Sequence, residues 1–126
     1  MIEEVLVDRL LAWTGLSALI GARLDPVLTV GDTTVPGVVY RRISEEWTFN
    51  LAGTTTGGTW TGEFECWHLE YSGALAIEKQ LRLALNGWQS LSENVYVVST
   101  QGGGDIYDDL VNVFGRVIEA TIEYHE

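Results

Sequence analysis

Hydrophobic residues at the start of the chain recur at intervals of three and four positions, which places their side chains on one face of an α-helix. They are Ile2, Val5, Leu6, Leu10 and Trp13. The pattern predicts a helix over residues 2–13, ended by Gly15. One further helical turn is predicted over residues 17–21 with Ser17 as its N-cap, and residues 25–36 are predicted to form a loop.

Alternation of apolar and polar residues replaces the helical spacing in the middle of the chain and predicts a long β-hairpin. One strand begins at Gly37 and continues, bent, to Phe49, and residues 52–58 are predicted to form the hairpin tip. The returning strand covers residues 59–71. Its two faces carry different residues: Trp60, Phe64, Cys66 and His68 on one, and Thr61, Glu63 and Glu65 on the other.

Helical spacing returns directly after this hairpin and is followed by two more strands. Ser72 is predicted to cap a helix over residues 73–86. Residues 94–100 are predicted to form a strand, which residues 101–105 break, and residues 112–124 form the last strand.

The order of these elements predicts an α+β fold. We expect an antiparallel β-sheet, with mixed pairing also allowed, two helices packed on one of its faces and a long protruding β-hairpin. No repeat or linker divides the chain, so residues 1–126 are predicted to form a single domain.

Charge narrows the classes of function. The chain has 126 residues, 7 basic against 18 acidic, and a formal net charge of −11. Binding to nucleic acid or to acidic membranes requires clustered Lys and Arg, so neither is expected. No stretch approaches the roughly 20 apolar residues of a membrane span. The acidic start lacks the basic region of a signal peptide, so we expect a cytoplasmic protein.

Few residues of the sequence are candidates for catalysis or for metal binding. Cys66 is the only cysteine, and Cys66 with His68 supplies two of the three or four ligands that zinc needs. The glycines at 102–104 are not followed by the Lys-Ser or Lys-Thr pair of a phosphate loop. The densest acidic cluster is Asp105, Asp108 and Asp109, which we interpret as a solvated turn. We therefore expect no catalytic residue, no metal and no cofactor, and a protein that is not an enzyme.

The aromatic residues suggest an interaction surface. Trp47, Phe49 and Trp60 lie in or beside the predicted hairpin, away from either helix. Because Trp is enriched at interaction hot spots, one interpretation is that this arm packs on a neighbouring subunit. The other is that the hairpin folds back and buries these side chains in the core. The sequence leaves both interpretations open.

Several segments, taken in order, are similar to one phage family. They are LSALIGARL at 16–24, VPGVVYRRIS at 35–44, FECW at 64–67, the helix that ends with LNG at 85–87, and the strand at 114–124. Together they cover nearly the whole chain. The chain resembles the tail-completion or tail-terminator proteins of long-tailed phages and gene transfer agents.

The resemblance implies a structural protein of the virion tail or neck, assembled in the host cytoplasm. Such proteins form a hexameric ring on the end of the tail tube, stop its growth and help to join the tail to the head. The implied partners are further copies of the chain, the tail tube protein and the head-tail connector protein. DNA would only pass through the lumen of the ring, without sequence-specific binding. The candidate carboxylates of an acidic lumen are Glu63, Glu65, Asp105, Asp108 and Asp109.

Two alternatives remain. The first is a head-side neck or head-tail connector protein, which docks on the connector instead of the tube. The second, more distant, is a small ligand-binding α+β module, which requires a pocket with converging polar groups.

Overall fold

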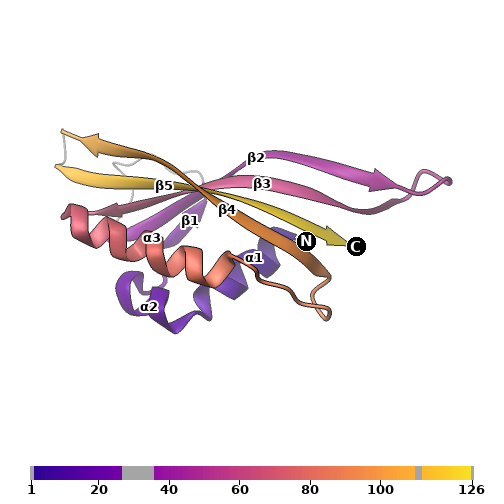
Figure 1. Cartoon of the computed structure of the whole chain (residues 1–126), viewed down its shortest axis with the longest axis horizontal. Coiled ribbons are helices and arrows are strands. Elements are labelled where there is room, and N and C mark those ends of the chain that lie inside the picture. Colours follow the sequence, from indigo (N-terminus) through magenta and orange to yellow (C-terminus); the bar gives the residue numbers. More distant parts are fainter. Residues whose placement is uncertain (1, 27–35, 110–111, 126) are drawn as a thin grey trace.

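The computed structural model describes residues 2–26, 36–109 and 112–125. Over these residues it contains three helices and five strands (Figure 1). The helices are α1 (Ile2–Leu11), α2 (Thr14–Ile20) and α3 (Tyr71–Leu85). The strands are β1 (Leu24–Pro26), β2 (Gly37–Phe49), β3 (Thr55–His68), β4 (Val95–Asp108) and β5 (Val113–His125).

The strands form one sheet in the order β1-β2-β3-β5-β4. Neighbouring strands are antiparallel except for the short β1, which is parallel to β2. All three helices lie on the same side of the sheet (Figure 1). The predicted α+β class, with helices on one face and a long β-hairpin, is therefore confirmed.

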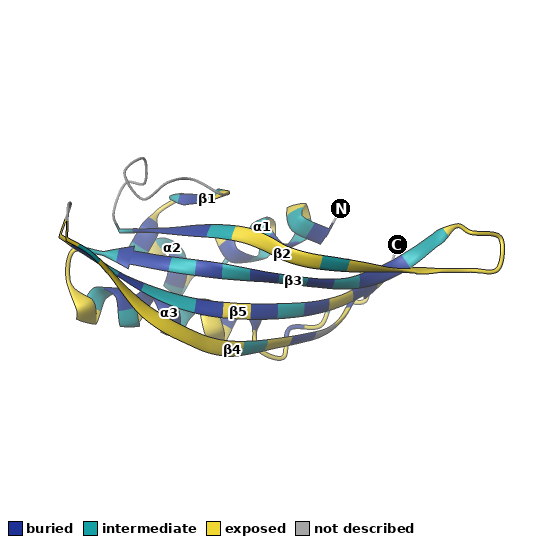
Figure 2. Ribbon diagram, turned by 90° about the horizontal axis from the view of Figure 1, so that it is seen from above, coloured by how far each residue is buried: buried dark blue, intermediate teal, exposed yellow. Residues whose placement is uncertain are grey.

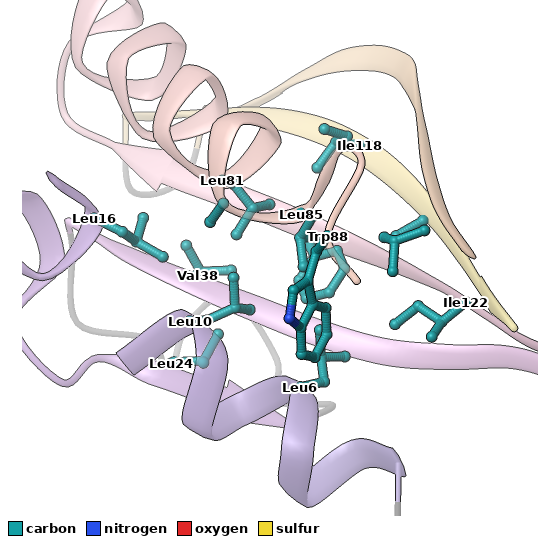
Figure 3. Packing of buried hydrophobic residues seen from close by; sticks show 14 of the residues in the cluster. Leu6, Leu10, Leu16, Leu24, Val38, Leu81, Leu85, Trp88, Ile118 and Ile122 are labelled. Atoms are coloured by element: carbon teal, nitrogen blue, oxygen red, sulfur yellow. The ribbon is translucent and has the colours of Figure 1, made fainter. Parts of the chain in front are cut away.

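The core lies between the helices and the sheet face that they cover. On β3 this face carries Trp60, Phe64 and Cys66, which are fully buried. Leucines of α1 and α3 pack against it, with Trp88 among them (Figure 3). The labelled members are Leu6, Leu10, Leu16, Leu24, Val38, Leu81, Leu85, Trp88, Ile118 and Ile122. Each fully buried aliphatic side chain contributes about 1.5–3 kcal/mol, so this layer accounts for much of the stability.

The ends of the helices differ from the prediction. Gly15 does not end the first helix but lies inside α2, where a side chain would collide with Gln80 of α3. Trp13, not Ser17, occupies the N-cap position of α2. Glu70, not Ser72, occupies the N-cap position of α3. Neither residue at these two positions forms a side-chain cap hydrogen bond, so packing of the helices on the sheet sets where they begin.

The strands are longer than predicted. In place of a tip at 52–58 the turn is short, because Asn50 Oδ1 accepts hydrogen bonds from the backbone N–H groups of Ala52 and Thr54. Gly57 and Gly58 belong to β3, where a side chain on Gly57 would collide with the backbone of Tyr124. β4 does not break at 101–105 but continues to Asp108 with a shift in register. Of the predicted loop at 25–36, residues 27–35 lie outside the described residues.

The β2–β3 hairpin extends beyond the rest of the sheet. Gly57 is the last β3 residue that pairs with β5, opposite His125. Beyond it, β2 and β3 pair only with each other. We call residues 43–56 the arm. Its base, residues 43–48 of β2, lies beside β3 where β3 still pairs with β5, and its tip, residues 49–56, extends beyond that pairing. Figure 2 shows the free end reaching past the other strands, with mostly exposed residues.

Candidate assembly surfaces

The arm carries a row of exposed apolar side chains, which we call the arm surface: Ile43, Trp47, Phe49 and Leu51. Trp47 is 48% exposed and Phe49 is 61% exposed. No charged residue occurs between positions 47 and 59, in a chain whose formal net charge is −11. A neutral aromatic projection of this kind is typical of a binding surface, because large rings bury much area at little cost in side-chain entropy.

Trp60 does not belong to this surface. Its side chain is fully buried, and its ring centroid lies 6.4 Å from that of Phe64. Its indole Nε1–H donates a hydrogen bond of 3.1 Å to Glu3 Oε1 of α1. Trp60 is thus a core residue that joins β3 to α1, so it is removed from the candidate subunit interface. Trp60 and Phe64 are four residues apart, which places both on the same face of a strand, and this even spacing was the sequence signal for a core role.

The sheet face turned away from the helices is acidic. Glu63 and Glu65 alternate with the core residues of β3 and therefore project from this open face. Glu119 of β5 lies directly opposite Glu63, and Glu123 lies opposite Thr59. Glu119 and Glu123 were not among the carboxylates predicted for the lumen. The alternation of the last strand places them on one face, but only its pairing with β3 shows that this is the face of Glu63.

Two features of this open face moderate its charge. The Arg41 guanidinium forms an ion pair with Glu63 on the neighbouring strand. Burial raises the pKa of the Glu65 carboxyl, Arg41 opposes that rise, and the charge of Glu63 adds to it. The carboxylates of Glu63, Glu65, Glu119 and Glu123 still outnumber the paired cation Arg41, so this part of the face repels other anions. Nearer the end of β3 the same face is apolar, with Val39, Trp67 and Val113 buried together.

Asp105 lies elsewhere. It pairs with Arg116, which in turn lies opposite the buried Cys66, so both belong to the face that the helices cover. Arg116 Nη1 donates a 2.6 Å hydrogen bond to Asp105 Oδ1, and the Tyr71 hydroxyl donates one of 2.9 Å to Oδ2. These hydrogen bonds, first from Tyr71 and then from Arg116, lower the pKa of the Asp105 carboxyl.

Arg116 also lies 3.7 Å from Glu78 of α3, so Asp105 belongs to an ion-pair network that joins β4, β5 and α3. Asp108 lies at the end of β4 opposite Val113, and the exposed Asp109 follows the strand. The five predicted acidic residues therefore do not form one surface. Glu63 and Glu65 share the open face, whereas Asp105 is removed from it.

A second apolar surface, which the sequence did not predict, lies at the end of the sheet opposite the arm tip (Figure 1). We call it the end cluster: Leu69, Tyr71, Tyr107 and Phe114. The Phe114 ring lies 5.9 Å from Tyr71 and 4.8 Å from Tyr107. Leu69 is 60% exposed and Tyr107 is 51% exposed. Leu69 lies between β3 and α3, and the other three residues belong to α3, β4 and β5. Only the pairing of β5 with both β3 and β4 reveals them as a group.

The side chains of Cys66 and His68, which could take part in catalysis or metal binding, are buried or hydrogen-bonded within the fold. Cys66 is fully buried, and burial raises the pKa of its thiol, which keeps it unreactive. His68 Nδ1 accepts a 2.9 Å hydrogen bond from the Glu70 backbone N–H. Within the described ranges no group of three or more His, Cys, Asp or Glu side chains is arranged to hold a metal ion. No helix of the described chain is long and apolar enough to cross a membrane.

The fold is shared with a virion protein. A chain in the solved structure described as "Virion of native gene transfer agent (GTA) particle" superposes with a TM-score of 0.68 at 14% sequence identity, over 96% of this chain and 92% of that one. The likeness therefore covers the arm, the sheet and the helices together. No protein-family profile matches the chain. No curated protein matches its sequence.

Proposed function

We propose that this protein is a structural, non-enzymatic virion protein that forms a ring on the end of the tail tube, ends tube polymerisation and helps to join the tail to the head. The observation that carries the proposal is the fold shared over nearly the whole length with a chain of a gene transfer agent virion. The tail-completion motifs of the sequence point to the same class of protein.

The shape of the molecule supports assembly into a ring. A cyclic ring requires two different surfaces on each subunit, one that meets the other on the next copy. The arm surface, with Trp47 and Phe49, supplies one such surface outside the folded core. A hexamer is the stoichiometry that the family resemblance implies.

The open face of the sheet suits the lumen of such a ring. Glu63, Glu65, Glu119 and Glu123 project from it, so passing DNA would meet like charge and slide through without adhering. The partners in this role are further copies of the chain, the tail tube protein and the head-tail connector protein. The site of action is the tail or neck of the virion, after assembly in the host cytoplasm.

Electron microscopy of tail tubes incubated with the purified protein tests the proposal. We expect six-fold rings at one end of each tube. A protein that remains monomeric and is never found on tubes would overturn it. Rings that bind the head connector and ignore the tube would favour the head-side neck protein. Monomers in the absence of tubes agree with the proposal, because the tube can template the ring.

A further inference from the structure

Two exposed apolar surfaces lie at opposite ends of the long axis of this molecule. The arm surface is formed by β2 and the hairpin turn, and the end cluster by the segments around the start of α3 and the β4–β5 connection. Figure 1 shows the arm tip and the start of α3 at opposite extremes. We infer that the arm surface of one copy packs against the end cluster of the next copy. This inference rests on the proposed self-assembly and names the two surfaces that would meet.

The end cluster is held in place before any partner arrives. The Tyr71 hydroxyl is fixed by Asp105 at 2.9 Å and by Arg116 at 3.2 Å. The Tyr107 hydroxyl donates a 2.9 Å hydrogen bond to Asn112 Oδ1. Because these rings are already oriented, little side-chain entropy is lost when another surface covers them. Tyr at a rigid, partly exposed position is typical of an interaction hot spot.

Charge favours a second copy as the occupant. Asp105 contacts Tyr71 of the end cluster and is paired with Arg116, and Glu70 and Asp109 lie within two residues of cluster members in the sequence. The whole chain is also strongly acidic. Two such molecules repel each other wherever charged surfaces meet. The base of the arm contains Glu45, which pairs with Arg42, and Glu46. From position 47 to position 59 there is no charged residue, so the outer part of the arm can approach an acidic neighbour without that repulsion.

The area of the contact indicates how strong it is. A fully covered aromatic side chain buries about 150–250 Å². Because Trp47 and Phe49 are about half exposed, the four side chains of the arm surface offer roughly 400 Å². A stable pair needs about 800 Å² on each partner. One contact is therefore weak, whereas a closed ring gives every copy two of them. We therefore expect the free protein to be a monomer and the tube to promote assembly.

Cysteine cross-linking between two single variants tests the contact. Phe49→Cys and Tyr107→Cys are mixed, at the highest soluble concentration and again on tail tubes, with a short bis-maleimide. We expect the mixture to form a cross-linked pair at a yield several-fold above that of either variant alone. Cys66 does not interfere, because it is fully buried. Tyr96→Cys is the matched control, since Tyr96 is an exposed tyrosine of the same strand at its other end.

The outcomes separate this inference from the proposed function. Equal cross-linking of Phe49→Cys with itself, or with Tyr96→Cys, would overturn the inference. Rings on tubes without the Phe49–Tyr107 cross-link would overturn it while leaving the proposed function intact. The cross-link without any binding to tubes would support the inference and overturn the tail-capping function. No association under either condition would overturn both.

Discussion

Trp47 and Trp60 show how one residue type serves two purposes in the same hairpin. Trp60 is fully buried against Phe64 and α1, whereas Trp47 is 48% exposed on the arm. Their positions in the sheet account for the difference. Trp60 lies opposite Ile122 in the core, whereas Trp47 lies opposite Gly58, near the end of the sheet.

Alanine substitution of the two residues should separate stability from assembly. Trp60→Ala removes a buried ring and should lower the free energy of unfolding by about 3–5 kcal/mol. Trp47→Ala should change it by less than about 1 kcal/mol, because the ring is half exposed, yet it should weaken binding to tubes. Urea denaturation measures the first effect and electron microscopy the second. Equal destabilisation by both variants would contradict these separate roles.

Asp105 gives a residue-scale prediction for pH. Hydrogen bonds from Tyr71 and Arg116 lower its pKa in the folded protein. A carboxyl with a lowered folded pKa stabilises the fold above its unfolded pKa of about 3.9 and loses that contribution as the pH falls through the folded value. Asp105→Asn should therefore lower Tm by a constant amount from about pH 5 to 8, and by less below about pH 4. Thermal denaturation followed by circular dichroism measures this. A difference in Tm that grows in acid would contradict the ion-pair network.

At the scale of elements, the tip of the arm, residues 49–56, has no third strand beside it, because the pairing of β3 with β5 stops at Gly57. A two-stranded ribbon is marginal alone, so its order depends on the sheet from which it extends. The turn at Asn50 and the contact of Thr48 Oγ1 with Thr56 Oγ1, 3.2 Å apart, hold its free end.

Shortening the arm should remove assembly and leave the fold. Residues 49–56 are replaced by Asn-Gly, which favours a tight hairpin turn between the paired residues Thr48 and Gly57. Pairing of β3 with β5 begins at Gly57, so the core is untouched, and the free energy of unfolding should change by less than about 1 kcal/mol. Binding to tubes should be lost. Leu91→Ala is a control for loss of exposed apolar area, because Leu91 is 86% exposed outside the arm. Normal rings from the shortened chain would refute the role of the arm.

Periodicity predicts most of the elements of this fold but not their pairing. The stripes of α1 and α3 and the alternation of β3 and β5 are visible in the sequence, because each depends on one buried face. The strand character of residues 101–105 is not visible, because it depends on pairing with β5: Gln101, Gly102 and Asp105 have partners there, and Gly103 and Gly104 lie in the register shift between them. The end cluster is likewise hidden, since Tyr71, Tyr107 and Phe114 meet only through tertiary contacts.

At the scale of the whole molecule, the acidic open face predicts how a ring treats DNA. Glu119→Lys combined with Glu123→Lys changes the formal net charge from −11 to −7, since each substitution adds two charges. We expect rings that retain DNA and slow its ejection. Asp8→Lys with Glu93→Lys is the matched control, because it makes the same change in charge at exposed positions of α1 and of the segment before β4. Ejection slowed equally by both pairs would show that overall charge, not the open face, is responsible.

The length of growing tail tubes tests the central claim most directly. Tube subunits are allowed to polymerise, the protein is added during growth, and the lengths are measured by electron microscopy. We predict that tubes stop elongating once the protein is added, each with a ring at its growing end, and that the arm-shortened chain leaves growth unchanged. Tubes that continue to elongate at the same rate in the presence of excess intact protein would contradict the account.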